Sequence, residues 1–209
     1  MTGPKQKRSE KGAMDKTASG DSPILIVGLG NVGERYLKTR HNVGWMVIDR
    51  LASSSGLELR QNDKLKARIA TGSEPSSDRM IVLAQPTTMM NLSGQAVGLI
   101  QNFYKVEGLN VIVVYDDKDI DFGEIKVQPG GRGTGGHNGV ASLPSDVLGQ
   151  ANRVRIGVAN EALSYMDTAD FVLQKFATKE HERLEEILIP DAVEQIKKLI
   201  SELSSRISG

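Results

Sequence analysis

The chain has 209 residues, and its 26 Lys and Arg balance 26 Asp and Glu, so the formal net charge is zero. Hydrophobic residues make up 39% of it, which is enough for one globular domain with a buried core. It contains no cysteine, which excludes disulfides, thiolate metal sites and a cysteine nucleophile. No apolar run approaches the roughly 18 residues of a membrane span, so we expect a soluble intracellular protein.

Residues 1–22 are polar and lack periodic hydrophobic positions, which predicts a disordered N-terminal extension. The stretch has no apolar segment of the kind a secretory signal needs. It contains a single Arg together with Glu10, Asp15 and Asp21, whereas mitochondrial transit peptides are Arg-rich and poor in acids. We therefore expect a cytoplasmic protein, with a mitochondrial location as the alternative, and one domain over residues 23–209.

Predicted strands alternate with predicted helices along this domain. Continuous or alternating apolar residues predict strands, and apolar residues on one face at helical spacing predict helices. The C-terminal stretch is either two helices or one kinked helix broken at Pro190. The alternation predicts an α/β fold, in which helices flank both faces of a twisted, mixed, mostly parallel sheet. The expected strands are 23–29, 66–72, 79–85, 110–116, 123–128 and 153–159, and the expected helices are 44–56, 93–106, 179–188 and 191–205.

The stretch "GLGNVG" from Gly28 to Gly33 fits G-x-G-x-x-G, a fingerprint of dinucleotide-binding turns. Asp49 follows at about the distance of the acid that would hold a ribose. However, the segment between Gly33 and Trp45 leaves no room for the crossover helix that such a unit needs, and "MVIDRLA" favours a helix over a strand. An NAD-dependent enzyme is therefore a poor interpretation of this stretch.

Polar side chains follow several of the predicted strands, where open α/β sheets form their binding sites. They include Asn31 and His41 after the first strand, Asn91 after "MIVLAQ", and Asp116 after "VIVVY". A Gly-rich stretch at 130–139 ends in His-Asn. Histidine is the usual general base near neutral pH, a carboxylate can fix its tautomer, and carboxamides can polarise a carbonyl. Together these residue types predict general-base chemistry.

The sequence lacks the G-x-S-x-G of a serine hydrolase and the H-E-x-x-H of a zinc protease. Ser93 is better explained as a residue at the start of a helix. The remaining candidate nucleophile is water activated by histidine, which predicts hydrolysis of a reactive carbonyl such as an ester. Lys126, Arg155 and Arg132 could contact phosphate or could form surface ion pairs.

Six stretches occur in an order that resembles the bacterial-type peptidyl-tRNA hydrolase family, and together they cover roughly residues 23–176. Members of that family cleave the ester between a peptide and the 3′ end of tRNA, need no cofactor and are usually monomeric. The resemblance therefore implies a cytoplasmic enzyme that acts on peptidyl-tRNA without a metal. The stretches are "GLGNVGERYLKTRHNVG", "QPTTMMNLSGQAV", "DDKDIDFGEIKV", "GGRGTGGHNG", "RVRIGV" and "DFVLQKF".

By position, the resemblance makes His41 the catalytic base and Asp116 the carboxylate that orients it. Asn91 would polarise the ester carbonyl, and Asn31 would hold the substrate close to it. The segment 162–171 corresponds to a mobile lid over the cleft. The resemblance further implies substrate contacts in the cleft and in a phosphate clamp. The cleft contacts are Tyr36, Met90, His137 and Asn138, and the clamp consists of Lys126 and Arg155.

The chain departs from the family pattern in a few places. Val32 replaces a proline in the first turn, Met89 stands where Phe is common, and Gln128 replaces a second basic residue. The Gly-rich stretch is about one residue longer than usual. None of these departures touches His41 or Asp116. A second hypothesis stays open, a non-catalytic RNA-binding relative that shares the fold, as some chloroplast splicing factors do, because retained active-site residues alone do not exclude it.

Overall fold

A seven-stranded sheet with the strand order β2-β3-β4-β1-β5-β7-β6 forms the centre of the molecule. The computed structural model describes residues 22–131 and 133–205, so the predicted extension at 1–22, apart from Ser22, and Arg132 lie outside the described residues. The strands are β1 (Ile24–Gly28), β2 (Arg60–Asn62), β3 (Ala67–Ser73), β4 (Met80–Pro86), β5 (Val111–Asp121), β6 (Ile125–Gln128) and β7 (Asn152–Ala159).

The four central strands run parallel, and antiparallel strands flank them. β1 pairs in parallel with β4 and β5, and β5 pairs in parallel with β7. β2, β3 and β4 pair antiparallel to one another in turn, and β6 pairs antiparallel to β7. The sheet is thus mixed with a parallel centre, as expected, and the carboxyl ends of the central strands meet at one edge.

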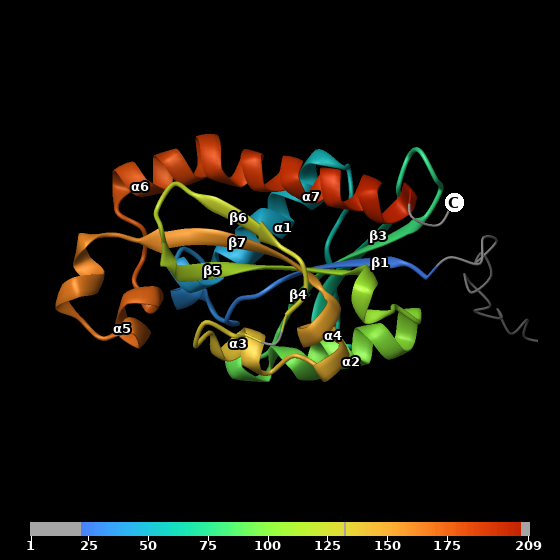
Figure 1. Cartoon of the computed structure of the whole chain (residues 1–209), viewed down its shortest axis with the longest axis horizontal. Coiled ribbons are helices and arrows are strands. Elements are labelled where there is room, and N and C mark those ends of the chain that lie inside the picture. Colours follow the sequence, from blue (N-terminus) through green and yellow to red (C-terminus); the bar gives the residue numbers. More distant parts are fainter. Residues whose placement is uncertain (1–21, 132, 206–209) are drawn as a thin grey trace, which may run out of the picture.

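Helices cover both faces of the sheet, as predicted, and each face has its own apolar core (Figure 1). α1 (Val43–Ser54) and α7 (Ile189–Ser205) lie on one face, while α2 (Ser93–Tyr104), α3 (Asn138–Ala141) and α4 (Ser145–Gln150) lie on the other. α5 (Thr168–Leu173) and α6 (Thr178–Arg183) lie toward the same end of the sheet, α6 in line with α7 and α5 apart from it. Among the described residues, no helix combines the length and apolar character needed to cross a bilayer.

Short 3₁₀ turns carry the chain from the central strands into the helices that follow. They place several polar residues at the carboxyl edge of the sheet. These turns are η1 (Glu34–Tyr36) and η2 (Arg40–Asn42) after β1, η3 (Met90–Leu92) after β4 and η5 (Glu161–Tyr165) after β7. A further 3₁₀ turn, η4 (Gly108–Asn110), leads instead from α2 into the amino end of β5.

Most predicted elements lie within a few residues of their expected bounds, but β5 is longer than predicted. The predicted strand stops at residue 116, whereas β5 continues to Asp121 because it stays paired with β7 past the last residue that pairs with β1. Asp116 therefore lies within a strand rather than after one. The short elements β2, α3, α4 and α5 were not predicted, because each spans too few residues for a clear hydrophobic period.

The C-terminal helices do not break at Pro190, contrary to one prediction. α6 leads into a π-helical turn, η6 (Leu184–Leu188), and α7 begins at Ile189. Pro190 directly follows this π-helical turn, whose irregular hydrogen bonding accommodates a residue that lacks a backbone N–H. The irregular turn precedes the proline, so helix continues on both sides of it.

The glycines of "GLGNVG" serve helix packing in this structure. A Cβ on Gly28 would lie 2.2 Å from the carbonyl oxygen of Gly44, and one on Gly30 would lie 2.6 Å from the Trp45 ring. Gly33 has a φ of 120°, which side-chain-bearing residues rarely adopt. Asp49 lies inside α1 rather than after a second strand. Over residues 28–49 the structure therefore lacks both features of a dinucleotide-binding unit, the crossover helix that begins at the third glycine and the acidic residue after a second strand.

We predict that Gly28→Ala destabilises the fold, because the new Cβ would meet the Gly44 oxygen and the Ile48 side chain. Such overpacking costs about 1–3 kcal/mol and lowers the midpoint of denaturant unfolding. Gly149→Ala is the matched control, since nothing lies within 4 Å of its added Cβ and it lies in α4. The control should keep or raise the midpoint, because Ala in place of Gly in a helix raises the free energy of unfolding by up to about 1 kcal/mol. Equal midpoints for the two variants would contradict this packing.

Candidate active site

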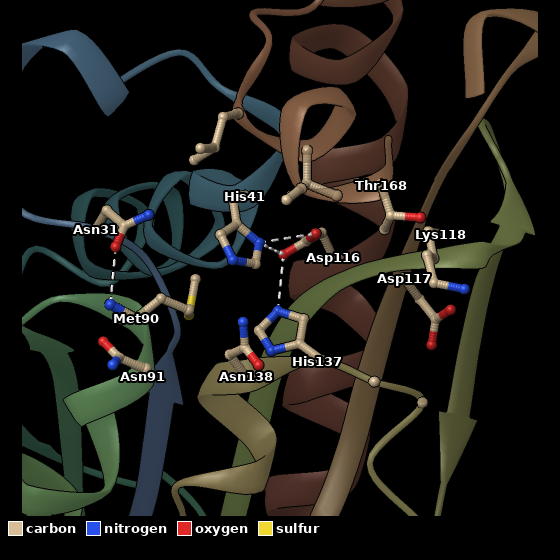
Figure 2. Close-up of a pocket in the computed structure, with 15 residues that line it drawn as sticks. Asn31, His41, Met90, Asn91, Asp116, Asp117, Lys118, His137, Asn138 and Thr168 are labelled. Atoms are coloured by element: carbon tan, nitrogen blue, oxygen red, sulfur yellow. Dashed lines mark hydrogen bonds and ion pairs between the residues drawn. The ribbon is translucent and has the colours of Figure 1, made fainter. Parts of the chain in front are cut away.

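A cleft of about 510 Å³ lies at the carboxyl edge of the parallel strands (Figure 2). Its walls come from the turns after β1 and β4, from β5, from the end of the Gly-rich stretch and from α5. The cleft brings together residues that are far apart in the sequence. The lining residues are Asn31, His41, Met90, Asn91, Asp116, Asp117, Lys118, Gly135, Gly136, His137, Asn138, Thr168, Ala169, Val172 and Leu173.

Asp116 is the centre of this site, and its carboxylate is only 2% exposed. The Nδ1 atom of His41 lies 2.9 Å from one carboxylate oxygen and 3.0 Å from the other. With Asp116 ionised, Nδ1 carries the ring proton, and this N–H donates a hydrogen bond to the carboxylate. The other ring nitrogen of His41 is therefore the lone-pair nitrogen, and it faces the side of the cleft where Asn31 and Met90 lie (Figure 2).

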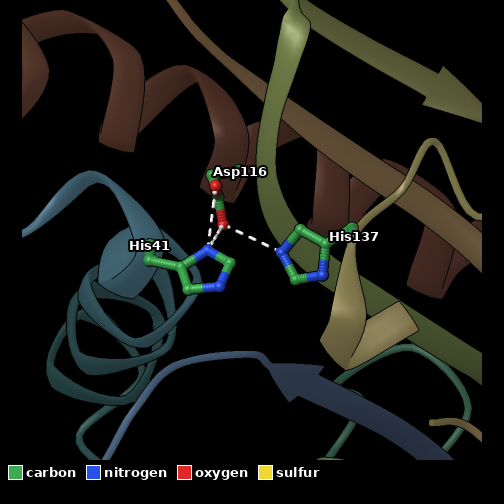
Figure 3. Close-up of side chains that lie close together, drawn as sticks. All are labelled: His41, Asp116 and His137. Atoms are coloured by element: carbon green, nitrogen blue, oxygen red, sulfur yellow. Dashed lines mark hydrogen bonds and ion pairs between the residues drawn. The ribbon is translucent and has the colours of Figure 1, made fainter. Parts of the chain in front are cut away.

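A second imidazole contacts the same carboxylate, as Figure 3 shows. The Nε2 atom of His137 lies 3.0 Å from Asp116 Oδ1. The Nδ1 atom of His137 accepts the backbone N–H groups of Gly139 and Val140, and so caps the N terminus of α3. Because Nδ1 is an acceptor, the proton of the ring is on Nε2, which donates to Asp116. His137 is thus a fixed donor to the carboxylate that orients His41.

The mutual contacts shift the pKa values of the pair. Burial by itself would raise the pKa of Asp116, but the charges and hydrogen bonds of His41 and His137 outweigh it and hold that pKa well below its usual range. For His41 burial acts to lower the pKa, but the charge and hydrogen bond of Asp116 prevail and raise it above 6.5. Asp116 therefore stays ionised, and His41 is a stronger base than a free imidazole.

The ligand atoms of His41, Asp116 and His137 lie within 4.8 Å of one another, a cluster that could in principle hold a metal ion. Two features of the donor set argue against that use. Both histidine nitrogens that face Asp116 carry protons, and an ion would have to displace them. His137 cannot move its proton to Nδ1 without losing two backbone hydrogen bonds. We interpret the cluster as a hydrogen-bonded base, and the absence of a resident metal stays a prediction.

Asn31 is held at the cleft by a network of backbone contacts. Its Oδ1 accepts the N–H of Met90 at 2.8 Å, which leaves its amide nitrogen directed into the cleft (Figure 2). The side chain of Asn42 exchanges two hydrogen bonds with the backbone of Asn31, at 2.9 and 3.0 Å. The turn after β1 and the turn after β4 are therefore joined beside His41, and Asn31 presents an amide donor there.

The remaining predicted cleft residues divide into two groups. Met90, Asn91 and Asn138 line the cleft, and the two asparagines are exposed within it. Tyr36 does not line this cavity; it lies in η1, with the Arg35 guanidinium 4.6 Å from the centre of its ring. The structure thus places three of these four side chains in the same cleft as His41.

The two predicted phosphate contacts lie outside the cleft, on the strands at the edge of the sheet. Lys126 of β6 and Arg155 of β7 are directly opposite each other in the sheet. Lys126 is half-exposed and lies 3.5 Å from Glu124. Arg155 donates to Asp117 at 2.7 Å and to Gln128 at 2.9 Å. Gln128, a departure from the family pattern, therefore contacts a predicted phosphate ligand.

Part of the cleft wall was not predicted from the sequence. Asp117 and Lys118 line it because β5 continues past Asp116, which strand-end reasoning did not predict. Thr168 and Ala169 belong to the predicted lid at 162–171, but Val172 and Leu173 lie just beyond it. The apolar positions of "TADFVL" indicate an amphipathic turn, and this signal could have extended the predicted segment.

The fold and the site define a class: an α/β protein with a histidine base oriented by a buried aspartate, beside amide donors. A family model described as peptidyl-tRNA hydrolase matches residues 25–208. The peptidyl-tRNA hydrolase of Streptomyces avermitilis is 38% identical over 201 residues, which is 95% of this chain and 98% of that protein. The chain belongs to the peptidyl-tRNA hydrolase family.

Two further comparisons agree with this assignment. A chloroplastic peptidyl-tRNA hydrolase of Arabidopsis thaliana is 43% identical over 165 residues, or 78% of this chain and 56% of that protein. The crystal structure of the peptidyl-tRNA hydrolase of Acinetobacter baumannii superposes with a TM-score of 0.78 at 29% identity, covering 88% of this chain and 92% of that one. The fold expected from the resemblance is confirmed.

We predict that Asp116→Asn lowers the pKa of His41, because it removes the charge that raises this pKa and leaves the burial that lowers it. Histidine resonances followed by NMR across the titration measure the shift. Asp49→Asn, which removes the same charge from an exposed position on α1, is the control and should leave the His41 titration unchanged. An unchanged His41 titration in Asp116→Asn would show that the carboxylate does not set the basicity of the histidine.

Proposed function

We propose that this protein hydrolyses the ester bond of peptidyl-tRNA and releases free tRNA and peptide, with His41 as the general base. The observation that carries the proposal is the His41–Asp116 contact, which leaves the lone-pair nitrogen of His41 facing a cleft with amide donors. Membership of the peptidyl-tRNA hydrolase family supports the same reaction.

The reaction begins when His41 takes a proton from a water molecule in the cleft. The resulting hydroxide attacks the ester carbonyl carbon, and the carbonyl electrons move to its oxygen. Asp116 stabilises the imidazolium that forms, since its charge lies about one hydrogen bond away. The tetrahedral intermediate collapses with loss of the ribose oxygen of tRNA, which recovers the proton from His41.

Three asparagines give the cleft its proposed selectivity. Asn91, in η3, donates to the ester oxygen as it becomes negative. Asn31 holds the substrate beside the base through the amide nitrogen that its contact with Met90 leaves available. Asn138, exposed at the start of α3, contacts the peptide backbone or the attacking water. Contacts with the peptide amide would favour peptidyl-tRNA over aminoacyl-tRNA, which lacks that amide.

The tRNA would be held chiefly through its phosphates, with Lys126 and Arg155 as the proposed contacts on the β6–β7 edge. Tyr36 lies outside the cleft, so any substrate contact it makes is away from the ester. The monomeric state, the cytoplasmic location and the lack of a cofactor remain predictions. Relatives from Streptomyces and from a chloroplast agree with a bacterial-type enzyme.

We predict that His41→Ala slows peptide release from an N-blocked aminoacyl-tRNA by roughly 10²–10⁴-fold, the usual loss on removal of a general base. In the wild type, kcat/KM should rise with pH through the raised pKa of His41, above 6.5, because only the neutral ring can accept a proton. Single-turnover release measured across pH tests both expectations.

The control for this measurement is His181→Gln, which changes a histidine of α6 that does not line the cleft. It should release peptide at the wild-type rate. A folded wild type that binds tRNA without cleaving it would overturn the hydrolase proposal and favour the non-catalytic RNA-binding alternative. Equal rates for wild type and His41→Ala would remove His41 as the base.

We predict that Lys126→Ala weakens tRNA binding and makes it less sensitive to salt. Loss of one phosphate contact should reduce the slope of log affinity against log salt by about 1. Lys197→Ala is the matched control, because Lys197 of α7 is also half-exposed and paired with a glutamate, Glu194. Identical salt slopes for these two variants would argue against the clamp.

A further inference from the structure

Arg40, the neighbour of His41, has a buried guanidinium that the proposed reaction does not use. Its side chain is 4% exposed. The guanidinium carbon lies over two aromatic rings, 4.6 Å from the centre of Phe171 and 5.2 Å from that of Phe176. A buried cation is tolerated only with charged or hydrogen-bonding partners, and aromatic ring faces add further attraction, so the surroundings of Arg40 determine where its guanidinium lies.

The acceptors of Arg40 come from the chain just after α5. Its Nη1 donates to the carbonyl of Lys175 at 2.8 Å, and its Nη2 forms an ion pair with Glu180 at 2.7 Å. The backbones join at the same place, where the N–H of Arg40 donates to the carbonyl of Gln174 at 3.0 Å. Thr39 and Lys175 form an isolated antiparallel bridge. The turn that carries His41 is therefore fixed to the end of α5.

Glu180 extends this junction to the other end of the segment over the cleft. Its Oε2 accepts the N–H of Ala177 at 2.8 Å in addition to Arg40, and its Oε1 accepts the Nδ2 of Asn160 at 2.6 Å. Residues 160–177, which we name the cover segment, contain η5 and α5. One carboxylate thus holds both ends of the cover segment, and one arginine connects that carboxylate to the turn of His41.

The cover segment forms one wall of the cleft. Thr168, Ala169, Val172 and Leu173 of α5 line it, on the side opposite the turn that carries Asn91 (Figure 2). Phe171 of the same helix turns inward to the apolar core and contacts the Arg40 guanidinium. A shift of α5 would therefore move the wall and the surroundings of Arg40 together.

We propose that Arg40 is a positioning residue. Through Glu180 and the backbone at 174–175 it fixes the position of the cover segment relative to His41. The inference rests on the proposed hydrolase function for its kinetic consequence. Without the Arg40–Glu180 pair mainly the backbone contacts at 174–175 still join the two segments, so the distance between the wall and His41 varies more. A substrate in the cleft then meets His41 in a wider range of geometries. Reaction rates are sensitive to such displacements, and about 1 Å of misplacement can cost 10²-fold.

Three substitutions of similar size test the pair. Glu180→Gln removes the charge and is the milder change, since that carboxylate is 16% exposed; Arg40→Lys keeps the charge but loses the forked geometry. Arg40→Met removes both. The matched control is Arg50→Met, which breaks an exposed ion pair, 44% and 42% accessible, that joins α1 to Glu185 without contacting the cover segment.

Amide hydrogen exchange of the substrate-free protein is the first readout. Glu180→Gln and Arg40→Met should speed exchange in peptides from 160–177 and leave β1 and β5 protected, because only a local junction is lost. Arg50→Met should leave all of these unchanged. Faster exchange throughout the sheet, or unchanged exchange in the cover segment, overturns the inference whatever the activity.

Kinetics on an N-blocked aminoacyl-tRNA is the second readout. Per folded molecule, kcat should fall by roughly 10–100-fold in Arg40→Met, less in Arg40→Lys, and not at all in Arg50→Met. The pH dependence should keep the His41 pKa of the wild type, since Asp116 is untouched. Unchanged kcat and KM per folded molecule would mean that the pair is only structural. An inactive wild type would overturn the proposed function instead, and hydrogen exchange alone would then decide whether Arg40 fixes the segment.

Discussion

The structure of the cleft depends on one buried charge. Asp116 lies in the interior of a parallel strand, where an ionised carboxylate without partners would cost several kcal/mol. Two imidazoles offset that cost, and they come from opposite sides: His41 from the turn before α1 and His137 from the start of α3. The carboxylate therefore fixes where both turns can lie. The orientation of the base follows from the same contacts that make the buried charge tolerable.

The parallel centre of the sheet explains why these partners meet. β1, β4 and β5 end or pass at one edge, so the turn of Asn31, the turn of Met90 and the carboxylate of Asp116 lie side by side. Close packing of α1 on β1, which the absence of side chains at Gly28 and Gly44 permits, brings His41 down to that edge. A sequence that resembles a nucleotide-binding turn is thus used to seat a helix and present a base.

The sequence predicted the central strands, the two long helices that flank β1 and β4, and the residues around the base, because each has a clear period or an unusual polar side chain after an apolar run. It did not predict the contact between His137 and Asp116, which depends on a tertiary turn and on an imidazole that caps a four-residue helix. Nor did it place Tyr36, whose neighbours are set by the path of η1. Arg40 precedes His41 in the same motif, yet its partners lie more than 130 residues away in the chain, and no local sequence pattern predicts them.

The sharing of Asp116 also bears on how the molecule folds. Its two partners precede and follow it by 75 and 21 residues, and the Arg40 junction spans 140 residues to Glu180. A partly folded chain that buried Asp116 before either histidine arrived would hold an uncompensated charge, so such intermediates are disfavoured. Contacts of such long sequence separation form slowly, because the loops they close lose conformational entropy first. The cleft is therefore expected to assemble late and all at once, and the charge that we propose serves the reaction makes the final step of folding cooperative.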